Sequence, residues 1–240
     1  MNYKLTIAYD GYFFSGYAKQ CETINTIQSN LEAKLSQLFC EKIVTFASGR
    51  TDKYVHAFNQ VISFKNKKIL EAESIQKFLN NNLSHIYVKN VEYMDDSFNA
   101  RFSAKSKSYL YIINMGEFNL FSQNYEWQYN KPIDLNKCNV AIKYFVGEKN
   151  FLSFSASNLE NTIRKINFIK IYVYNQKLFF LINGTGFLRS MVRMIVATII
   201  NYCESKIEIA DIENLFLNPK KGACISKAVG SGLYLYKVYY

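Results

Sequence analysis

Three short segments of this sequence combine side chains that can do chemistry. The first, at residues 47–57, reads ASGRTDKYVHA and holds Arg50, Asp52, Lys53 and His56 in one loop. Neighbouring cations keep an aspartate ionised at neutral pH. Such a carboxylate suits either a nucleophile or a structural ion pair. An aspartate in a turn more often caps backbone amides, so this loop alone does not establish an active site.

The second segment, at residues 183–193, reads NGTGFLRSMVR. Its glycine-rich turn predicts the start of a helix, with Arg189 and Arg193 four residues apart on one face. An arginine near a helix N-terminus interacts unfavourably with the helix dipole, which costs ~0.3–1 kcal/mol of helix stability for each arginine. Residues placed against local preference are candidates for function, here gripping phosphate or pairing with a carboxylate. The alternative is a solvated helix face.

The third segment, at residues 98–111, reads FNARFSAKSKSYLY and alternates basic with aromatic residues as it enters a predicted strand. That pattern suits phosphate contact combined with base stacking. A strand with one exposed cationic face gives the same pattern, so none of the three segments is decisive by itself.

The composition favours a polyanionic partner. The 240 residues include 29 Lys and Arg against 19 Asp and Glu, a net charge of +10. Nucleic acid is the first expectation and an acidic membrane the second. A codon bias toward A and T would explain the many Lys, Asn and Tyr residues, but not the positions of the arginines. Without a long apolar run or a signal-like N-terminus, we expect a cytoplasmic protein that does not span the membrane.

No cofactor or metal is expected. The sequence contains no CxxC pair, no HxxxH pair and no glycine-rich nucleotide loop. The cysteines are expected to be reduced core thiols; they are Cys21, Cys40, Cys138, Cys203 and Cys224.

The elements that would position these segments repeat one order twice. Period-two and helical spacing predict, in the first half, a strand at 3–9, a helix opened by a capping box at Asn25 and Gln28, strands at 43–47 and 55–64, a helix at 74–81 and a strand at 86–93. The second half is predicted to hold a strand at 108–114, a helix opened by Asp134, a hairpin of 163–174 with 177–183, helices at 187–203 and 208–217, and a strand at 233–239. We therefore predict an α+β fold of two ferredoxin-like (split β-α-β) halves with mainly antiparallel sheets, divided near residue 100 into 1–100 and 101–240.

Taken together, the motifs resemble the TruA family of tRNA pseudouridine synthases over residues 3–240. The matching segments are, in order, Tyr9-Asp10-Gly11, Gly49-Arg50-Thr51-Asp52, Val55-His56-Ala57, Ala100–Ala104, Tyr109 with Tyr111, Gly184–Arg193, and Gly232–Leu235 with Val238 and Tyr240. The resemblance implies a tRNA enzyme that isomerises uridine to pseudouridine at positions 38, 39 and 40 of the anticodon stem-loop. It also implies a homodimer without a cofactor, whose halves pack into one pseudouridine-synthase core.

The resemblance also assigns roles. Asp52 becomes the catalytic carboxylate, which attacks C1′, adds to C6 or removes a C2′ proton; the sequence does not choose among these routes. Arg193 pairs with Asp52, Tyr109 stacks on the extruded base, and Arg50 displaces that base. A second set of residues is expected to bind RNA: Arg101, Arg164 and Arg189 at phosphates, and Leu233 in the pocket.

The chain departs from the family pattern at several positions. Tyr54 replaces a loop glycine, so that a positive φ there would strain the turn or force the loop into another shape. Tyr17 replaces a tryptophan and Asn99 a histidine. His56 is expected to organise the loop or contact RNA, and His85 to be structural. Two rival hypotheses remain, a non-catalytic RNA-binding module and a small-molecule enzyme whose charge reflects codon bias.

Overall fold

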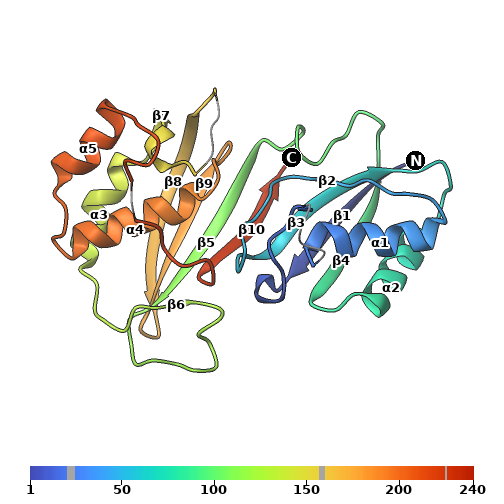
Figure 1. Cartoon of the computed structure of the whole chain (residues 1–240), viewed down its shortest axis with the longest axis horizontal. Helices are drawn as coiled ribbons and strands as arrows, with labels where there is room; N and C mark the ends of the chain where they lie inside the picture. The colour runs from blue at the N-terminus through green and yellow to red at the C-terminus, as the bar shows by residue number, and fades with distance from the viewer. Residues whose placement is uncertain (21–24, 157–159, 225) are drawn as a thin grey trace. The chain divides into compact units, whose positions relative to one another are not determined.

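The computed structural model describes residues 1–20, 25–156, 160–224 and 226–240, and it divides into two compact units (Figure 1). The first unit contains residues 1–105 and 234–240, and the second contains residues 106–233. Residues 234–240, expected in the C-terminal half, lie with the first unit in the structure.

The sheet of the first unit is built around β3 (His56–Lys65). β1 (Asn2–Tyr9) lies between β3 and β4 (Ile86–Met94), antiparallel to both. The short β2 (Phe46–Ala47) also pairs with β3 in the antiparallel sense, and β10 (Leu233–Tyr239) pairs with β3 in the parallel sense. β2 is shorter than the strand predicted at 43–47.

Helix α1 (Ile27–Phe39) contributes an apolar face to the core of this unit, together with α2 (Ala72–Asn82). Phe39 contacts the stacked rings of Tyr3 and Phe64 edge-on, at centroid distances of 5.7 and 5.5 Å. The apolar residues of α1 recur at helical spacing because one stripe must face the sheet.

The capping box predicted at Asn25 and Gln28 is wrong by one residue. Thr26 is the N-cap of α1, and its Oγ1 accepts the Ser29 backbone N–H at 3.1 Å. The Ser29 hydroxyl in turn accepts the Thr26 backbone N–H at 3.0 Å. A serine can therefore close the box where a longer Glu or Gln side chain was expected.

The sheet of the second unit has the order β5-β9-β8-β7 with antiparallel neighbours. These strands are β5 (Ser106–Asn114), β7 (Gly147–Asn150), β8 (Ile163–Tyr174) and β9 (Lys177–Gly184), with β6 (Trp127–Gln128) parallel to β5. The hairpin predicted around Asn175 and Gln176 is confirmed, and both residues have positive φ, as a tight hairpin turn requires. The α+β class with mainly antiparallel pairing is therefore confirmed.

Three helices complete the second unit: α3 (Leu135–Ala141), α4 (Met191–Cys203) and α5 (Ile209–Leu217). Asp134 caps α3 as predicted, accepting the Asn136 N–H at 2.8 Å. α4 begins four residues later than predicted, because Ser190 adopts a left-handed φ of 63° directly before it.

Not all cysteines are core thiols. Cys40 is exposed, which contradicts the prediction, and Cys21 lies outside the described residues. Cys138 and Cys203 are free thiols with their sulfur atoms 3.3 Å apart. In the part of the chain that the structure describes, no helix is long and apolar enough to cross a membrane.

Candidate active site

The loop that carries Asp52 starts on a buried polar anchor, Gln60 of β3. The Gln60 side chain is fully buried, and its Oε1 accepts the Ser48 hydroxyl at 2.6 Å. Its Nε2 donates to the Gly49 carbonyl at 2.8 Å, and the Ser48 N–H donates to the Val61 carbonyl at 2.8 Å. The chain therefore leaves β2 toward Asp52 in a fixed direction.

Thr51, directly before Asp52, is held from two sides. The Tyr9 hydroxyl at the end of β1 lies 2.8 Å from Thr51 Oγ1, and both side chains are buried. The Tyr17 N–H donates to the Thr51 carbonyl at 3.0 Å. Gly16 has a φ of +101°, and a Cβ there would lie 3.1 Å from that carbonyl oxygen. Tyr17, at the usual tryptophan position, is buried and thus completes this packing.

Asp52 begins a four-residue turn, closed by a 3.2 Å hydrogen bond from the Val55 N–H to the Asp52 carbonyl. The third residue, Tyr54, has a φ of 67°. A β-turn with positive φ at this position favours glycine. Tyr54 therefore keeps the turn a glycine would make, and the left-handed conformation costs about 1–2 kcal/mol. Of the two outcomes left open by the sequence, the structure shows the strained turn.

Gly11 is required by the same turn. A Cβ at Gly11 would lie 2.0 Å from the Val55 carbonyl oxygen, so no other residue fits without displacing backbone. The Gly11 N–H donates to His56 Nδ1 at 3.1 Å. His56 is 2% exposed and its ring stacks on Tyr234 at 4.7 Å. As an acceptor for a backbone amide, His56 organises the loop.

Two of the predicted site residues therefore lie together in the first unit. The Asp52 side chain is half-buried, and Arg50 is exposed two residues before it. The hydrogen bonds that shape this loop come from Gln60, Thr51 and His56, so neither the Asp52 nor the Arg50 side chain is among the groups shown to build it.

Tyr109 lies in the second unit, on β5 opposite Ile182 of β9. It is 7% exposed, and its ring packs edge-on against Phe187 at 5.0 Å. Tyr111 shares its face of β5, and the Tyr111 hydroxyl donates to the Val229 carbonyl at 2.8 Å. Burial raises the pKa of Tyr111 despite the opposing charge of Arg193, so this hydroxyl stays neutral.

Arg193 lies in the first turn of α4 and is half-buried. Its Nε donates to the Ala228 carbonyl at 2.7 Å, and its own carbonyl accepts the Ala228 N–H at 3.2 Å. Arg189 is exposed and precedes the helix, so the prediction that both arginines share one helix face is wrong. The Arg189 carbonyl accepts the Ala156 N–H at 3.1 Å, which holds this segment out of helical geometry.

Three predicted residues remain, Arg164, Arg101 and Leu233. Arg164 on β8 is half-buried, and it donates to the Ile163 carbonyl at 2.6 Å; burial lowers the pKa of its guanidinium. Arg101 is exposed, with its guanidinium carbon 5.4 Å from the centre of the Phe102 ring. Leu233 is buried where β10 begins.

Asn99, at the usual histidine position, caps a turn. Its Oδ1 accepts the backbone N–H groups of Arg101 and Phe102 at 2.9 and 3.2 Å. Asparagine supplies such caps readily, so the substitution preserves the course of the chain into Arg101.

Three residues that support the site had no role assigned from the sequence: Gln60 and Tyr9, which hold the Asp52 loop, and Phe187, which packs against Tyr109. Tyr9 and Phe187 lie within the matching motifs, which was the available signal for them, whereas Gln60 lies in no motif. Among the described residues, no cluster of three or more His, Cys, Asp or Glu could hold a metal ion.

Known proteins are similar to this chain over its whole length. The family model described as "tRNA pseudouridine synthase" matches residues 5–103 and 141–240. The protein named tRNA pseudouridine synthase A of Malacoplasma penetrans is 56% identical over 241 residues, covering 100% of both chains. Proteins of the same name in Ureaplasma parvum serovar 3 and Dictyoglomus thermophilum are 45% and 38% identical, again over 100% of both chains. The chain therefore belongs to the tRNA pseudouridine synthase family.

Proposed function

We propose that this tRNA pseudouridine synthase isomerises uridine at positions 38, 39 and 40 of the tRNA anticodon stem-loop, with Asp52 as the catalytic carboxylate. The single observation that carries the role of Asp52 is its place in a loop braced by buried polar groups at Gln60, Thr51 and His56. That framework fixes the backbone next to Asp52 and leaves its side chain half-buried, within reach of a substrate.

The reaction exchanges one bond to the sugar for another. The bond from C1′ to the ring nitrogen N1 breaks, the uracil rotates, and a bond from C1′ to C5 forms. C5 then loses its proton to a base or to solvent and N1 takes up a proton, so that the composition is unchanged. Asp52 would act by attack on C1′, addition to C6 or removal of a C2′ proton. All three routes need an ionised carboxylate held at the sugar or the ring.

Three further residues are proposed to act with Asp52. Arg193 would keep the carboxylate ionised and oriented by pairing with it, since an unpaired carboxylate in a dry pocket tends to protonate. Its bond to Ala228 already directs the side chain. Tyr109, held edge-on by Phe187, would stack on the extruded uracil. Arg50 would displace the base from its stack.

The substrate has to be gripped while one base leaves the helix, which costs a few kcal/mol. Phosphate contacts would offset that cost, and the proposed donors are Arg101, Arg164 and Arg189. Leu233 would line the pocket. The net charge of +10 supports a polyanionic substrate of this kind.

The architecture follows from the same proposal. The strands of the first unit have the antiparallel order β4-β1-β3-β2. Helix α1 connects β1 to β2 and helix α2 connects β3 to β4, as in a ferredoxin-like half. We propose a second such half for residues 101–240, both halves packing into one pseudouridine-synthase core. A cytoplasmic homodimer working without a cofactor completes the proposal.

The test is tritium release from tRNA transcribed with 5-tritiated uridine, because forming the C5–C1′ bond expels the C5 hydrogen. Wild type should release label, and Asp52→Asn should release it at least about 10³-fold more slowly, which is ~4 kcal/mol of barrier. Asp96→Asn is the matched control, since the Asp96 side chain is 87% exposed in the same unit.

Each other outcome removes one hypothesis. Equal release by wild type and Asp52→Asn would take Asp52 out of the mechanism. No release by wild type, with salt-sensitive tRNA binding retained, would instead favour the RNA-binding module.

A further inference from the structure

Exposed aromatic side chains from three separate segments meet beside the Asp52 turn. Tyr12 and Phe13 lie in the short 3₁₀ helix Gly11–Phe13 after β1, Tyr54 lies in the turn itself, and His85 precedes β4. Tyr12, Phe13 and Tyr54 are 42%, 42% and 40% exposed. We name these four residues, with Lys53, the aromatic shelf.

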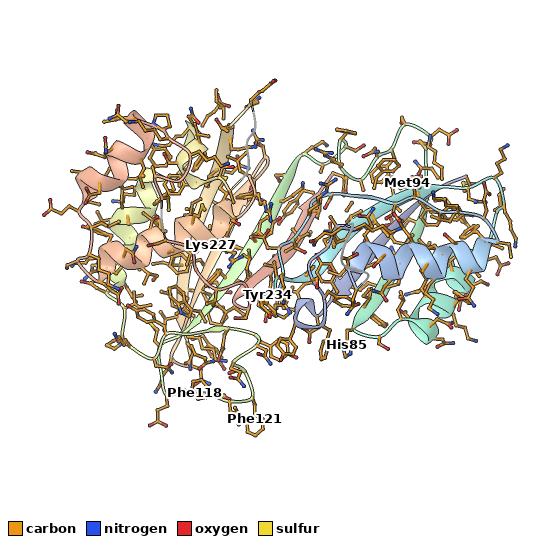
Figure 2. All side chains as sticks on the ribbon, viewed as in Figure 1. His85, Met94, Phe118, Phe121, Lys227 and Tyr234 are labelled. Atoms are coloured by element: carbon orange, nitrogen blue, oxygen red, sulfur yellow. The ribbon has the colours of Figure 1, made fainter. Side chains whose placement is uncertain are left out.

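The rings of the shelf contact one another in sequence. Tyr54 stacks on Tyr12 with centroids 6.0 Å apart, and Tyr12 meets Phe13 edge-on at 5.3 Å. Phe13 stacks on His85 at 3.5 Å and 11° between the ring planes. Figure 2 labels His85 on the first unit. The result is a continuous aromatic surface that solvent reaches.

A cation accompanies the rings. Lys53 Nζ lies 4.7 Å from the centre of the Tyr54 ring, and Arg50 is exposed in the same loop. Exposed aromatic faces with adjacent cations are what unpaired nucleotides bind, because each base stacks and each phosphate is negative. An apolar protein partner would gain nothing from the cations.

The backbone under the shelf ties it to the Asp52 turn. The Asp10 N–H donates to the His85 carbonyl at 3.0 Å, and Asp10 Oδ1 accepts the Tyr12 N–H at 3.0 Å. Gly11 packs directly on the Val55 carbonyl. The shelf and the catalytic loop therefore form one rigid part of the first unit, so that a base held on the shelf is positioned relative to Asp52.

Tyr54, one of the residues of the aromatic shelf, has a strained backbone conformation. It occupies the left-handed conformation that a glycine would adopt freely, yet its ring is exposed rather than buried in a core. Strained residues of this kind cluster at functional sites, where the surroundings hold them in place. The cost of the left-handed backbone at Tyr54 is therefore accompanied by an exposed aromatic ring that glycine would lack.

We propose that the aromatic shelf stacks an unpaired base that flanks the target uridine. Extruding the target breaks its stacking on both neighbours. A neighbour that moves onto Tyr54 and Tyr12 recovers stacking, while Lys53 contacts its phosphate. This inference rests on the proposed function and extends it, since the target base itself is assigned to Tyr109.

The main variant is Tyr54→Gly, which removes the ring and also removes the strain of holding a side-chain-bearing residue at positive φ. We expect kcat/KM for tritium release to fall about tenfold, the typical loss of one base–aromatic stack, while thermal stability stays equal or rises. Tyr54→Phe keeps the ring and should match wild type. Tyr174→Ala, which removes a 74% exposed tyrosine in the second unit, is the control for surface aromatics.

A direct readout uses tRNA transcripts with 2-aminopurine at the 5′ or the 3′ neighbour of a single target uridine. Stacking quenches this base, so wild type should quench one of the two transcripts more strongly than Tyr54→Gly or Tyr12→Ala does. Equal quenching of both transcripts by all three proteins, or unchanged kcat/KM in Tyr54→Gly, overturns the shelf. Failure of wild type to release tritium would instead overturn the proposed function, so the two failures are distinguishable.

Discussion

The Asp52 loop and the segment leading to Arg193 are held in different ways. Buried polar side chains brace the Asp52 loop, chiefly Gln60 and Thr51. In the Arg193 segment, the main chain of Ala228 bonds to the carbonyl and to the Nε of Arg193, and the ring of Phe187 packs against Tyr109. Side-chain networks fix a loop precisely but fail when one member is lost, whereas backbone contacts tolerate most substitutions. The Asp52 loop should therefore be the more fragile of the two regions.

Among substitutions that leave the proposed catalytic residues in place, the largest effect is expected from Gly11→Ala. The new Cβ would lie 2.0 Å from the Val55 carbonyl oxygen, so the Asp52 turn has to move. We expect at least a 100-fold loss of kcat/KM for tritium release and roughly 3 kcal/mol lower stability in thermal unfolding.

Gly147→Ala is the matched control in the second unit. Its φ is +101° but nothing lies within 4 Å of the new Cβ, so only about 1 kcal/mol of stability should be lost, with activity intact. Similar activity losses in the two variants would break the comparison.

Gln60→Leu should have the next largest effect. The Ser48 hydroxyl and the Gly49 carbonyl would lose their buried partner, which costs roughly 2–3 kcal/mol. We expect about a tenfold lower kcat, because the loop loses its anchor. Gln76→Leu on α2 removes comparable bonds to the Val88 and Lys89 carbonyls and should leave kcat unchanged. An equal fall in kcat for both variants would contradict the bracing role.

Tyr111→Phe tests the second unit, and we expect it to lower kcat less than Gln60→Leu does. It removes one hydrogen bond, to the Val229 carbonyl, worth about 1 kcal/mol. Because Arg193 keeps its bond to Ala228, we expect less than a threefold change in kcat. The pH profile below pH 10 should not change, since burial raises the pKa of Tyr111 and its hydroxyl is neutral throughout. A loss as large as that of Gln60→Leu would show that the two regions are equally fragile.

The smallest effect concerns Glu32 in α1, whose carboxylate accepts the Thr45 N–H and hydroxyl just before the Asp52 loop. Burial would raise the pKa of Glu32, but hydrogen bonds from Lys19, Thr45 and Gln28 together lower it below its usual 4.5. A lowered folded-state pKa adds stability above the unfolded pKa, and that stability is lost as pH falls through the folded value. Between about pH 5 and pH 3, the Tm of wild type should therefore fall more steeply than that of Glu32→Gln; parallel curves would exclude this contribution.

The sequence predicted what depends on periodicity and missed what depends on distant polar contacts. The β8–β9 hairpin and the buried stripe of α1 follow from spacing alone. The start of α4 did not, because Ser190 is held in a left-handed conformation that no local pattern signals.

Within the candidate site, the motif around Asp52 could be recognised in the sequence, but the hydrogen bonds that hold its loop could not be predicted. Gln60 and Ser48 are separated by twelve residues, and Tyr9 and Thr51 by forty-two. Polar residues at such separations carry no period that would pair them. Only the fold brings them together, and the same holds for the rings of Tyr12 and Tyr54.

The pairing of β10 with β3 has a consequence for synthesis of the protein. Tyr234 lies opposite His56, the residue that accepts the Gly11 amide and closes the Asp52 loop. The Tyr240 hydroxyl donates to the Ala100 carbonyl, so the last residue also seals the first unit. Residues 234–240 are therefore synthesised after residues 1–105, whose sheet they join, and after the whole of the second unit. We therefore expect the Asp52 loop to reach its final packing only after β10 has been synthesised and paired with β3.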